Sequence, residues 1–319
     1  MACCAIVEQS SGQTLNFVNQ VADRVWNTDT NWNPQQLPTT STYAAVDWSI
    51  APELYITDGN GTISAIASVG TLAITGGSSQ YVLRATGSGF IPGHTAAPAS
   101  ITFGAGGSVP IASGLDYIGG TRDLIIGCTA SIEGALTAVV PNHLTMRARG
   151  EAYVDVWCKV TGAGSISLSV LPGQTSALFV FGRDISPLSD STGGTTIGPG
   201  VTQQVLTSSI QSAGSIMLSG PIGVGTCNLN GGTLMFFNFE ELTLANPINV
   251  TADSRVFLKD PITTLLGDVR TNGNRISILA SLAAPLTFRD CGWSAGDSGT
   301  IALSTDASVT LAVDSGASA

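Results

Sequence analysis

The residues best placed to do chemistry are carboxylates in the last quarter of the chain. Four aspartates alternate there with four arginines, namely Asp253, Asp260, Asp268 and Asp290 with Arg255, Arg270, Arg275 and Arg289. Glycosidases act through two carboxyl groups about 5–10 Å apart. Asp268 and Asp290 are 22 residues apart, so one repeat of that length would stack them on one face. Aspartate is equally the residue of turns and surface ion pairs, and we predict that role.

Other catalytic patterns are weaker. The sequence contains no G-x-S-x-G elbow, and His94 and His143 are its only histidines, which we expect in a loop and in a turn. Lys159 and Lys259 do not stand in a phosphate-binding loop. We therefore predict no catalytic residues and no cofactor, and we expect that the chain is not an enzyme.

Metal-ligating patterns are also incomplete. The six cysteines form no C-x-x-C pair, and we expect them to be small apolar core residues. Residues 27–31 alternate oxygen-bearing side chains as a calcium loop does, but Trp32 stands where glycine is expected. We predict no metal site.

The composition narrows the fold class. Only 11% of the 319 residues are charged, with two lysines and six glutamates, whereas soluble domains average about 25%. Lysine and glutamate normally cover exposed helix faces, so this composition argues against helical bundles and α/β enzymes. The mean hydropathy of +0.31 argues against disorder. The sequence therefore predicts an all-β chain.

Charge and hydropathy also limit the partners. The net charge of −10 repels phosphate backbones, so we expect no nucleic-acid partner. The sequence has no run of 18 apolar residues, so we expect no membrane-spanning helix.

The elements that would position these residues are short strands. From residue 53 onward, apolar runs of about 4–6 residues alternate with turns rich in Gly, Asn, Asp and Pro; examples are 124–126, 166–168 and 301–303. Such monotonous spacing favours a parallel β-solenoid with about 20–25 residues per repeat. Two β-sandwich or jelly-roll units are the alternative.

The pattern suggests five segments. Residues 1–20 are a predicted N-terminal arm and residues 21–52 a Trp/Pro-rich cap. Residues 53–185 are the first part of the solenoid, 186–214 a Ser/Thr/Gly-rich excursion or joint, and 215–319 the second part with a short tail. Within the first part, alternation over residues 144–160 suggests one long, half-exposed antiparallel strand that could meet a partner.

Two aromatic groups are the candidate protein contacts. The tryptophans have the bulk to cover the first repeat, and the phenylalanines suit a core or a subunit contact. The predicted interaction residues are Trp26, Trp32, Trp48, Phe236, Phe237 and Phe239.

A family resemblance rests on short motifs. The run 25–32 (VWNTDTNW) is followed by Leu37-Pro38 and by the strand-like run 70–74 (GTLAI), and 232–234 (GTL) repeats the latter's start. This resembles the β-solenoid repeats of bacterial autotransporter passengers and related surface proteins. The resemblance implies a right-handed parallel β-helix with a structural surface role and no catalytic residues.

Features expected of an exported passenger are missing from the sequence. It has neither a secretory signal nor an outer-membrane barrel, which favours synthesis in the cytoplasm. A rigid β rod made there resembles bacteriophage fibre, spike and decoration proteins. We therefore expect a structural virion protein, either a capsid decoration or a tail fibre or spike component.

The phage analogy implies that the protein forms a homotrimer located in the virion. Its partners would be itself and other virion or capsid proteins, with a host surface glycan as a further candidate. An autotransporter-type adhesin at the cell surface is the alternative, and a glycan-degrading β-helix enzyme the third.

Overall fold

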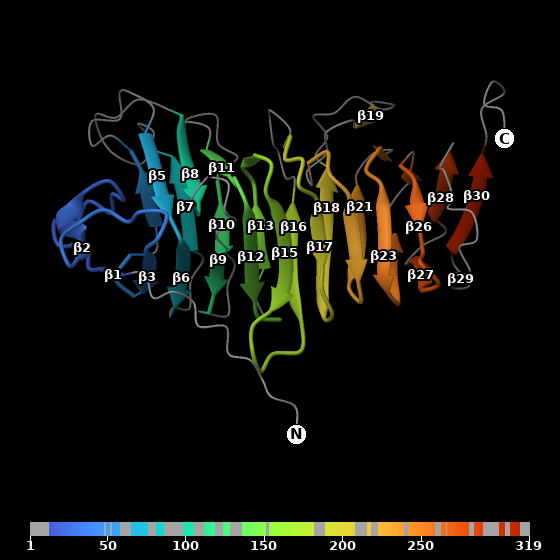
Figure 1. The fold of residues 1–319 in the computed structure, drawn as a ribbon, viewed down its shortest axis with the longest axis horizontal. Helices are drawn as coiled ribbons and strands as arrows, with labels where there is room; N and C mark the ends of the chain where they lie inside the picture. Colours follow the sequence, from blue (N-terminus) through green and yellow to red (C-terminus); the bar gives the residue numbers. More distant parts are fainter. Residues whose placement is uncertain are drawn as a thin grey trace.

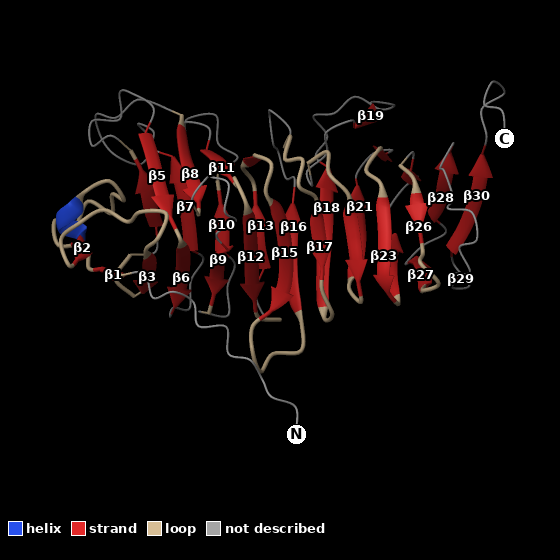
Figure 2. Ribbon diagram, viewed as in Figure 1, coloured by secondary structure: helices blue, strands red, loops and turns tan. Residues whose placement is uncertain are grey.

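The protein is described by a computed structural model. The described residues are 13–47, 49–51, 53–57, 65–75, 81–85, 98–104, 112–118, 124–127, 136–150, 153–181, 189–207, 216–217, 223–238, 242–258, 263–265, 267–280, 284–289, 300–303 and 307–312. They confirm an all-β chain: Figure 2 shows strands along the whole length, with the short 3-10 turn η1 (Asp29–Asn31) at one end.

The strands form four sheets. Sheet A contains, in spatial order, β2 (Trp32–Asn33), β1 (Thr14–Phe17), β3 (Tyr43–Asp47), β6 (Thr71–Thr75), β9 (Ala112–Tyr117), β12 (His143–Ala148), β15 (Ser165–Val170), β17 (Thr195–Ile197), β20 (Cys227–Asn230), β23 (Ile248–Ala252) and β26 (Val269–Arg270). Sheet B contains β4 (Glu53–Ile56), β7 (Tyr81–Ala85), β10 (Leu124–Ile126), β13 (Tyr153–Val156), β16 (Ala177–Phe181), β18 (Val201–Thr207), β21 (Thr233–Asn238), β24 (Ser254–Leu258), β27 (Arg275–Ala280) and β29 (Thr300–Leu303).

The other two sheets are smaller. Sheet C contains β5 (Ala65–Val69), β8 (Ala99–Phe103), β11 (Leu136–Val139) and β14 (Lys159–Thr161). Sheet D contains β19 (Ile216–Met217), β22 (Leu242–Leu244), β25 (Thr263–Leu265), β28 (Ala284–Arg289) and β30 (Ala307–Ala312).

The chain visits these sheets in a fixed order. From β3 to β14, successive strands belong to sheets A, B and C in turn, and from β20 to β28 to sheets A, B and D. We call one such passage a repeat. Figure 1 shows the repeats following one another along the long axis of the molecule.

Strand pairing is parallel throughout the described ladders except between β1 and β2. Sandwiches and jelly rolls are built mainly from antiparallel sheets. The observed pairing therefore disagrees with the alternative of two such units.

The apolar core lies between the sheets and consists of rows of side chains in register. One inward row of sheet A is Ala44, Leu72, Leu115, Met146, Leu168, Ile197, Leu229 and Val250. Leu115 of sheet A, Ile126 of sheet B and Ala138 of sheet C line one small apolar cavity. The inner faces of the three sheets thus enclose a common core, and burying these rows is the main source of stability.

One corner of each repeat brings backbone against backbone. A Cβ atom on Gly164 would lie 1.9 Å from the carbonyl oxygen of Asn142, and one on Gly267 would lie 2.0 Å from that of Asn246. Real Cβ atoms cannot approach so closely, so these two positions require glycine.

The predicted antiparallel strand over 144–160 is wrong. The segment contributes to three parallel strands, β12, β13 and β14, in three different sheets. Alternation of apolar and polar residues continues through both corners, so two bends in the chain left no trace in the pattern.

The segment 186–214, expected to be an excursion or a joint, contains β17 and β18. These strands pair in register with both neighbours in sheets A and B. Between residues 189 and 207 the chain therefore stays within the sheets. The third sheet changes around this segment, from sheet C, which ends at β14, to sheet D, which begins at β19.

Candidate functional site

Residues 13–33, which we call the N-terminal cap, close one end of the stacked repeats (Figure 1). Strand β1 of the cap pairs in parallel with β3, the first repeat strand of sheet A. The short strand β2 then pairs antiparallel on the outer side of β1. The cap therefore covers an edge of sheet A that would otherwise be open to another chain.

The same segment also contacts the first strands of sheets B and C. Residues 24–26 pair with β4: the Trp26 amide donates to the Tyr55 carbonyl at 2.8 Å, and the Tyr55 amide donates to the Arg24 carbonyl at 2.9 Å. The Asn27 side-chain amide donates to the Ile66 carbonyl of β5 at 2.9 Å. One stretch of chain thus contacts the edges of all three sheets.

An aromatic cluster fills the end of the core beneath the cap. The Trp32 ring lies edge-to-face against Phe17 and Trp26, with centroids 5.1 and 5.0 Å away. The Trp32 indole N–H donates to the Trp26 carbonyl at 2.9 Å. All three rings are at most 1% exposed. Buried aromatic pairs of this geometry contribute about 0.5–1.5 kcal/mol beyond their area.

Asn31 is the polar centre of the cap and is fully buried. Its side-chain amide donates to the Asp23 carboxylate at 2.5 Å and to the Val25 carbonyl at 3.0 Å. Its backbone carbonyl accepts from the Val18 amide at 2.7 Å, and its Oδ1 accepts from the Val21 amide at 3.3 Å. The side chain and carbonyl of Asn31 thereby satisfy polar groups of a segment that belongs to no ladder.

Three non-glycine residues of the cap have positive φ: Asn19, a residue type that adopts this region readily, and two that are strained there. Ala22 and Arg24 have φ values of 57° and 58°, in the left-handed region that costs non-glycine residues about 1–2 kcal/mol. The Asn19 side-chain oxygen accepts from the Arg24 amide at 2.9 Å, and Asp23 accepts from the Val25 amide at 3.0 Å. These two bonds hold the chain in the conformation that lets it cross from sheet A to sheet B.

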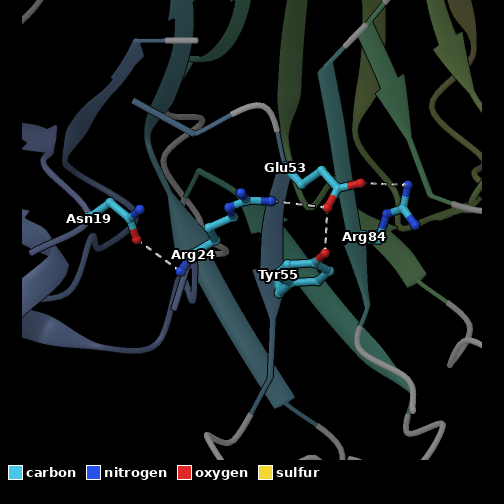
Figure 3. A network of polar contacts seen from close by, with 5 residues as sticks. All are labelled: Asn19, Arg24, Glu53, Tyr55 and Arg84. Carbon is cyan, nitrogen blue, oxygen red and sulfur yellow. Dashed lines mark hydrogen bonds and ion pairs between the residues drawn. The ribbon is translucent and has the colours of Figure 1, made fainter. Parts of the chain in front are cut away.

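A network around Glu53 connects the cap to sheet B (Figure 3). The Glu53 carboxylate lies 3.5 Å from the Arg24 guanidinium of the cap and 3.6 Å from that of Arg84 in β7. The Tyr55 hydroxyl donates to the same carboxylate at 2.5 Å. Because Arg24 is 42% exposed, its ion pair is screened by solvent and contributes at most about 1 kcal/mol.

Burial raises the pKa of Tyr55 above its ordinary value, and the hydrogen bond to Glu53 raises it further. The hydroxyl therefore stays protonated and serves as a donor. The arrangement brings a carboxylate, a phenol and two guanidiniums together, and each of them has a partner within the network. The network therefore holds the cap against sheet B.

A second polar cluster lies on the outer face of sheet A. The Arg147 guanidinium of β12 donates two hydrogen bonds of 2.7 Å to the buried Asp116 carboxylate of β9. The hydrogen bond to Asp116 raises the pKa of Arg147. This bidentate pair joins adjacent repeats across the ladder.

The outer surface at the cap end is comparatively apolar. Eight large apolar side chains are exposed in the described part of the chain, and five of them belong to the cap or to segments beside it: Val18, Val21, Leu37, Ile50 and Ile66. The other three are Ile118, Tyr153 and Val224. Exposed apolar side chains of this kind suit a contact with another protein.

The predicted interaction residues fall into three groups. Trp26, Trp32 and Phe236 are buried in the core, and Phe237 is half-buried. Trp48 and Phe239 lie outside the described residues. Burial leaves Trp26 and Trp32 no direct contact surface, whereas the exposed valines of the cap were not singled out by the sequence patterns.

The predicted turn aspartates are only partly described. Asp253 and Asp268 are exposed. Asp260 and Asp290 lie outside the described residues, so the separation of the Asp268 and Asp290 carboxylates stays a prediction. In the described segments, no three His, Cys, Asp or Glu side chains group as a metal site would require.

His143 is not the turn residue that we expected. It begins β12, and its Nδ1 lies 2.7 Å from the Ser165 hydroxyl of the next repeat. His94 lies outside the described residues. The two described cysteines, Cys158 and Cys227, are buried as expected, and burial raises the pKa of each thiol to about 12.

The chain matches no protein-family model, no curated protein and no solved structure in the comparisons made. Over the part of the chain that the structure describes, no helix has the length and apolar character to cross a membrane.

Proposed function

We propose that the chain is a right-handed parallel β-helix with an N-terminal cap. The fixed order in which strands visit the sheets supports this, as do the parallel ladders and the inward rows in register. A right-handed path is the usual one when parallel strands of one sheet are connected by a crossover.

As a function, we propose a structural virion protein of a bacteriophage, either a capsid decoration or a tail fibre or spike component. The observation that carries the proposal is the cap, which covers the edges of three sheets at one end of the repeats. An end covered in this way does not pair with further strands, so another copy does not stack onto it.

The cap end is the proposed contact surface for other virion proteins. Exposed apolar side chains of the cap, such as Val18 and Val21, provide the chemistry of a protein interface. Because only 11% of the residues are charged, few ion pairs would compete with apolar contacts at this surface. We further propose a homotrimer in which repeats pack side by side.

The proposal is tested by particle purification. Particles banded in a density gradient should contain the protein in a fixed copy ratio to the major shell protein, measured by quantitative mass spectrometry. Recovery of the protein in the cell-envelope fraction, with none in particles, would overturn the proposal in favour of the adhesin.

The contact surface is tested with a pair of exposed valines. Val21→Asp should reduce incorporation at least tenfold while the circular dichroism spectrum is unchanged. Val224→Asp, a matched exposed valine outside the cap, should incorporate normally. Equal incorporation of both variants would remove the cap from the interface.

A further inference from the structure

One layer of the core differs from those beside it. Between residues 189 and 205, four polar residues are buried. Ser189, Ser191, Thr195 and Gln203 are all between 0 and 4% exposed. At two of these four positions, those of Thr195 and Gln203, the neighbouring repeats place apolar residues or cysteine. Thr195 lies between Ile166 and Cys227 in its row of sheet A.

Gln203 is the most demanding member of this layer. It is 0% exposed, and its register partners in sheet B are Phe179 and Leu234, which are themselves fully buried. Neither Oε1 nor Nε2 of Gln203 has a hydrogen-bond partner within the protein that the structure describes. An amide buried without partners costs several kcal/mol.

Ser189 and Ser191 form the third side of the layer. The amides of Asp190 and Thr192 donate to the carbonyls of Val160 and Gly162 at 3.0 Å, so residues 189–192 run beside the edge strand β14. The Ser189 hydroxyl accepts from the Val160 amide at 3.0 Å. This stretch thus continues the wall of sheet C, and both serines are buried in it.

Thr195 and Gln203 belong to consecutive strands of this layer. The turn 198–200 separates β17 from β18, and each of the two inward residues lies a few positions from it. Both side chains therefore point into one interior from adjoining walls. A water molecule, which can both donate and accept, suits a glutamine amide and a threonine hydroxyl together.

We propose that this layer is an internal water-binding site, in which Gln203 and Thr195 share at least one bound water molecule. Water both accepts from the Gln203 amide and donates to its carbonyl oxygen. Such waters are integral to the fold and exchange slowly with the solvent.

The site is tested by counting long-lived internal waters with water ¹⁷O magnetic relaxation dispersion. We expect Gln203→Met, which keeps the length of the side chain, to lower the count by at least one. Gln204→Met changes the adjacent half-buried residue on the outer face of the same strand and should leave the count unchanged. An unchanged count in Gln203→Met would overturn the proposal.

Stability supplies an independent readout. If the water is shared, Gln203→Met and Thr195→Val should each lower the denaturation midpoint, and the double variant should lie no lower than the worse single variant. A higher midpoint for Gln203→Met would mean that the amide is simply unpaired in a dry core. Strictly additive losses would show that the two residues share no water. Either result would overturn the proposal.

Discussion

The N-terminal cap and the stacked repeats are two regions stabilised in different ways. In the repeats, side chains at equivalent positions form rows, and backbone ladders satisfy the polar groups. In the cap, individual side chains such as Asn31 perform that task, and three non-glycine residues have positive φ. Each repeat strand is stabilised by similar contacts with the repeats on both sides, whereas the contacts of the cap occur once.

The largest loss of stability should come from substitution of the corner glycines. They are the positions within the repeats where a side chain does not fit. Gly164→Ala places a methyl group against the Asn142 carbonyl of the preceding repeat, and we expect a loss of more than about 4 kcal/mol. Gly173→Ala is the control: it meets nothing within 4 Å but has a φ of 80°, so about 1–2 kcal/mol is expected. Urea denaturation checks both, and similar losses would show that the corner yields.

The cap core should be next. Trp32→Ala removes the ring at the centre of the aromatic cluster, and we expect about 3–5 kcal/mol of destabilisation. Because the cap would loosen from the sheet edges, light scattering should also detect association at concentrations where Leu168→Ala, in the middle of a repeat row, remains unassociated. If both variants associated equally, the cap would not be what protects the edges.

Two asparagines compare the regions directly. Asn31→Ala should cost about 2–3 kcal/mol, since it leaves buried amides and carbonyls of the cap unpaired. Asn249 lies in an outer ladder, where its amide donates to Asn228 at 2.9 Å and its oxygen accepts from Asn272 at 2.8 Å. Asn249→Ala should cost less than about 1 kcal/mol because water replaces these partners. Equal midpoints by chemical denaturation would contradict the distinction.

The smallest effect concerns Tyr55 and alkaline pH. Its pKa is raised in the folded state, so its contribution to stability is complete below the ordinary tyrosine value of about 10 and is lost as pH rises above it. Tyr55→Phe should cost about 1 kcal/mol at pH 7 by removing the hydrogen bond to Glu53. Above pH 10, the stability of this variant should fall less steeply than that of the wild type. Parallel pH profiles would show that Tyr55 does not titrate with unfolding.

The sequence predicts the strands better than their pairing. The expected runs 124–126, 166–168 and 301–303 all lie in strands, namely β10, β15 and β29. Whether two strands pair in parallel depends on where the chain turns, and the alternation over 153–160 runs through the corner between β13 and β14 unchanged. A period of two does not encode a change of sheet.

The sequence predicts an arm over residues 1–20 and a cap over 21–52, whereas the segment that contacts the sheet edges is 13–33 and includes β1, which pairs with β3. Trp26 and Trp32 indicate a covering element in the sequence, and both lie in the aromatic cluster beneath the cap. The sequence over 27–31 resembles an incomplete calcium loop. In the structure its side chains bond to the chain itself: Asn27 donates to β5, and Asn31 lies at the centre of the cap. Side-chain bonds to distant backbone have no periodicity, so no pattern reports them.

The pairing of consecutive repeats in parallel ladders sets the lengths that the molecule can adopt. His143 pairs with Ser165, so removing residues 143–164 would place the strand from 165 directly beside β9 with every inward residue still inward. The molecule would become shorter by one interstrand spacing, about 4.8 Å. Repeats of different length, such as 22 residues from His143 to Ser165 and 21 from Ile248 to Val269, keep the same residues inward because the turns between strands differ in length. Gene duplication and deletion can therefore change the length of such a protein only by whole repeats.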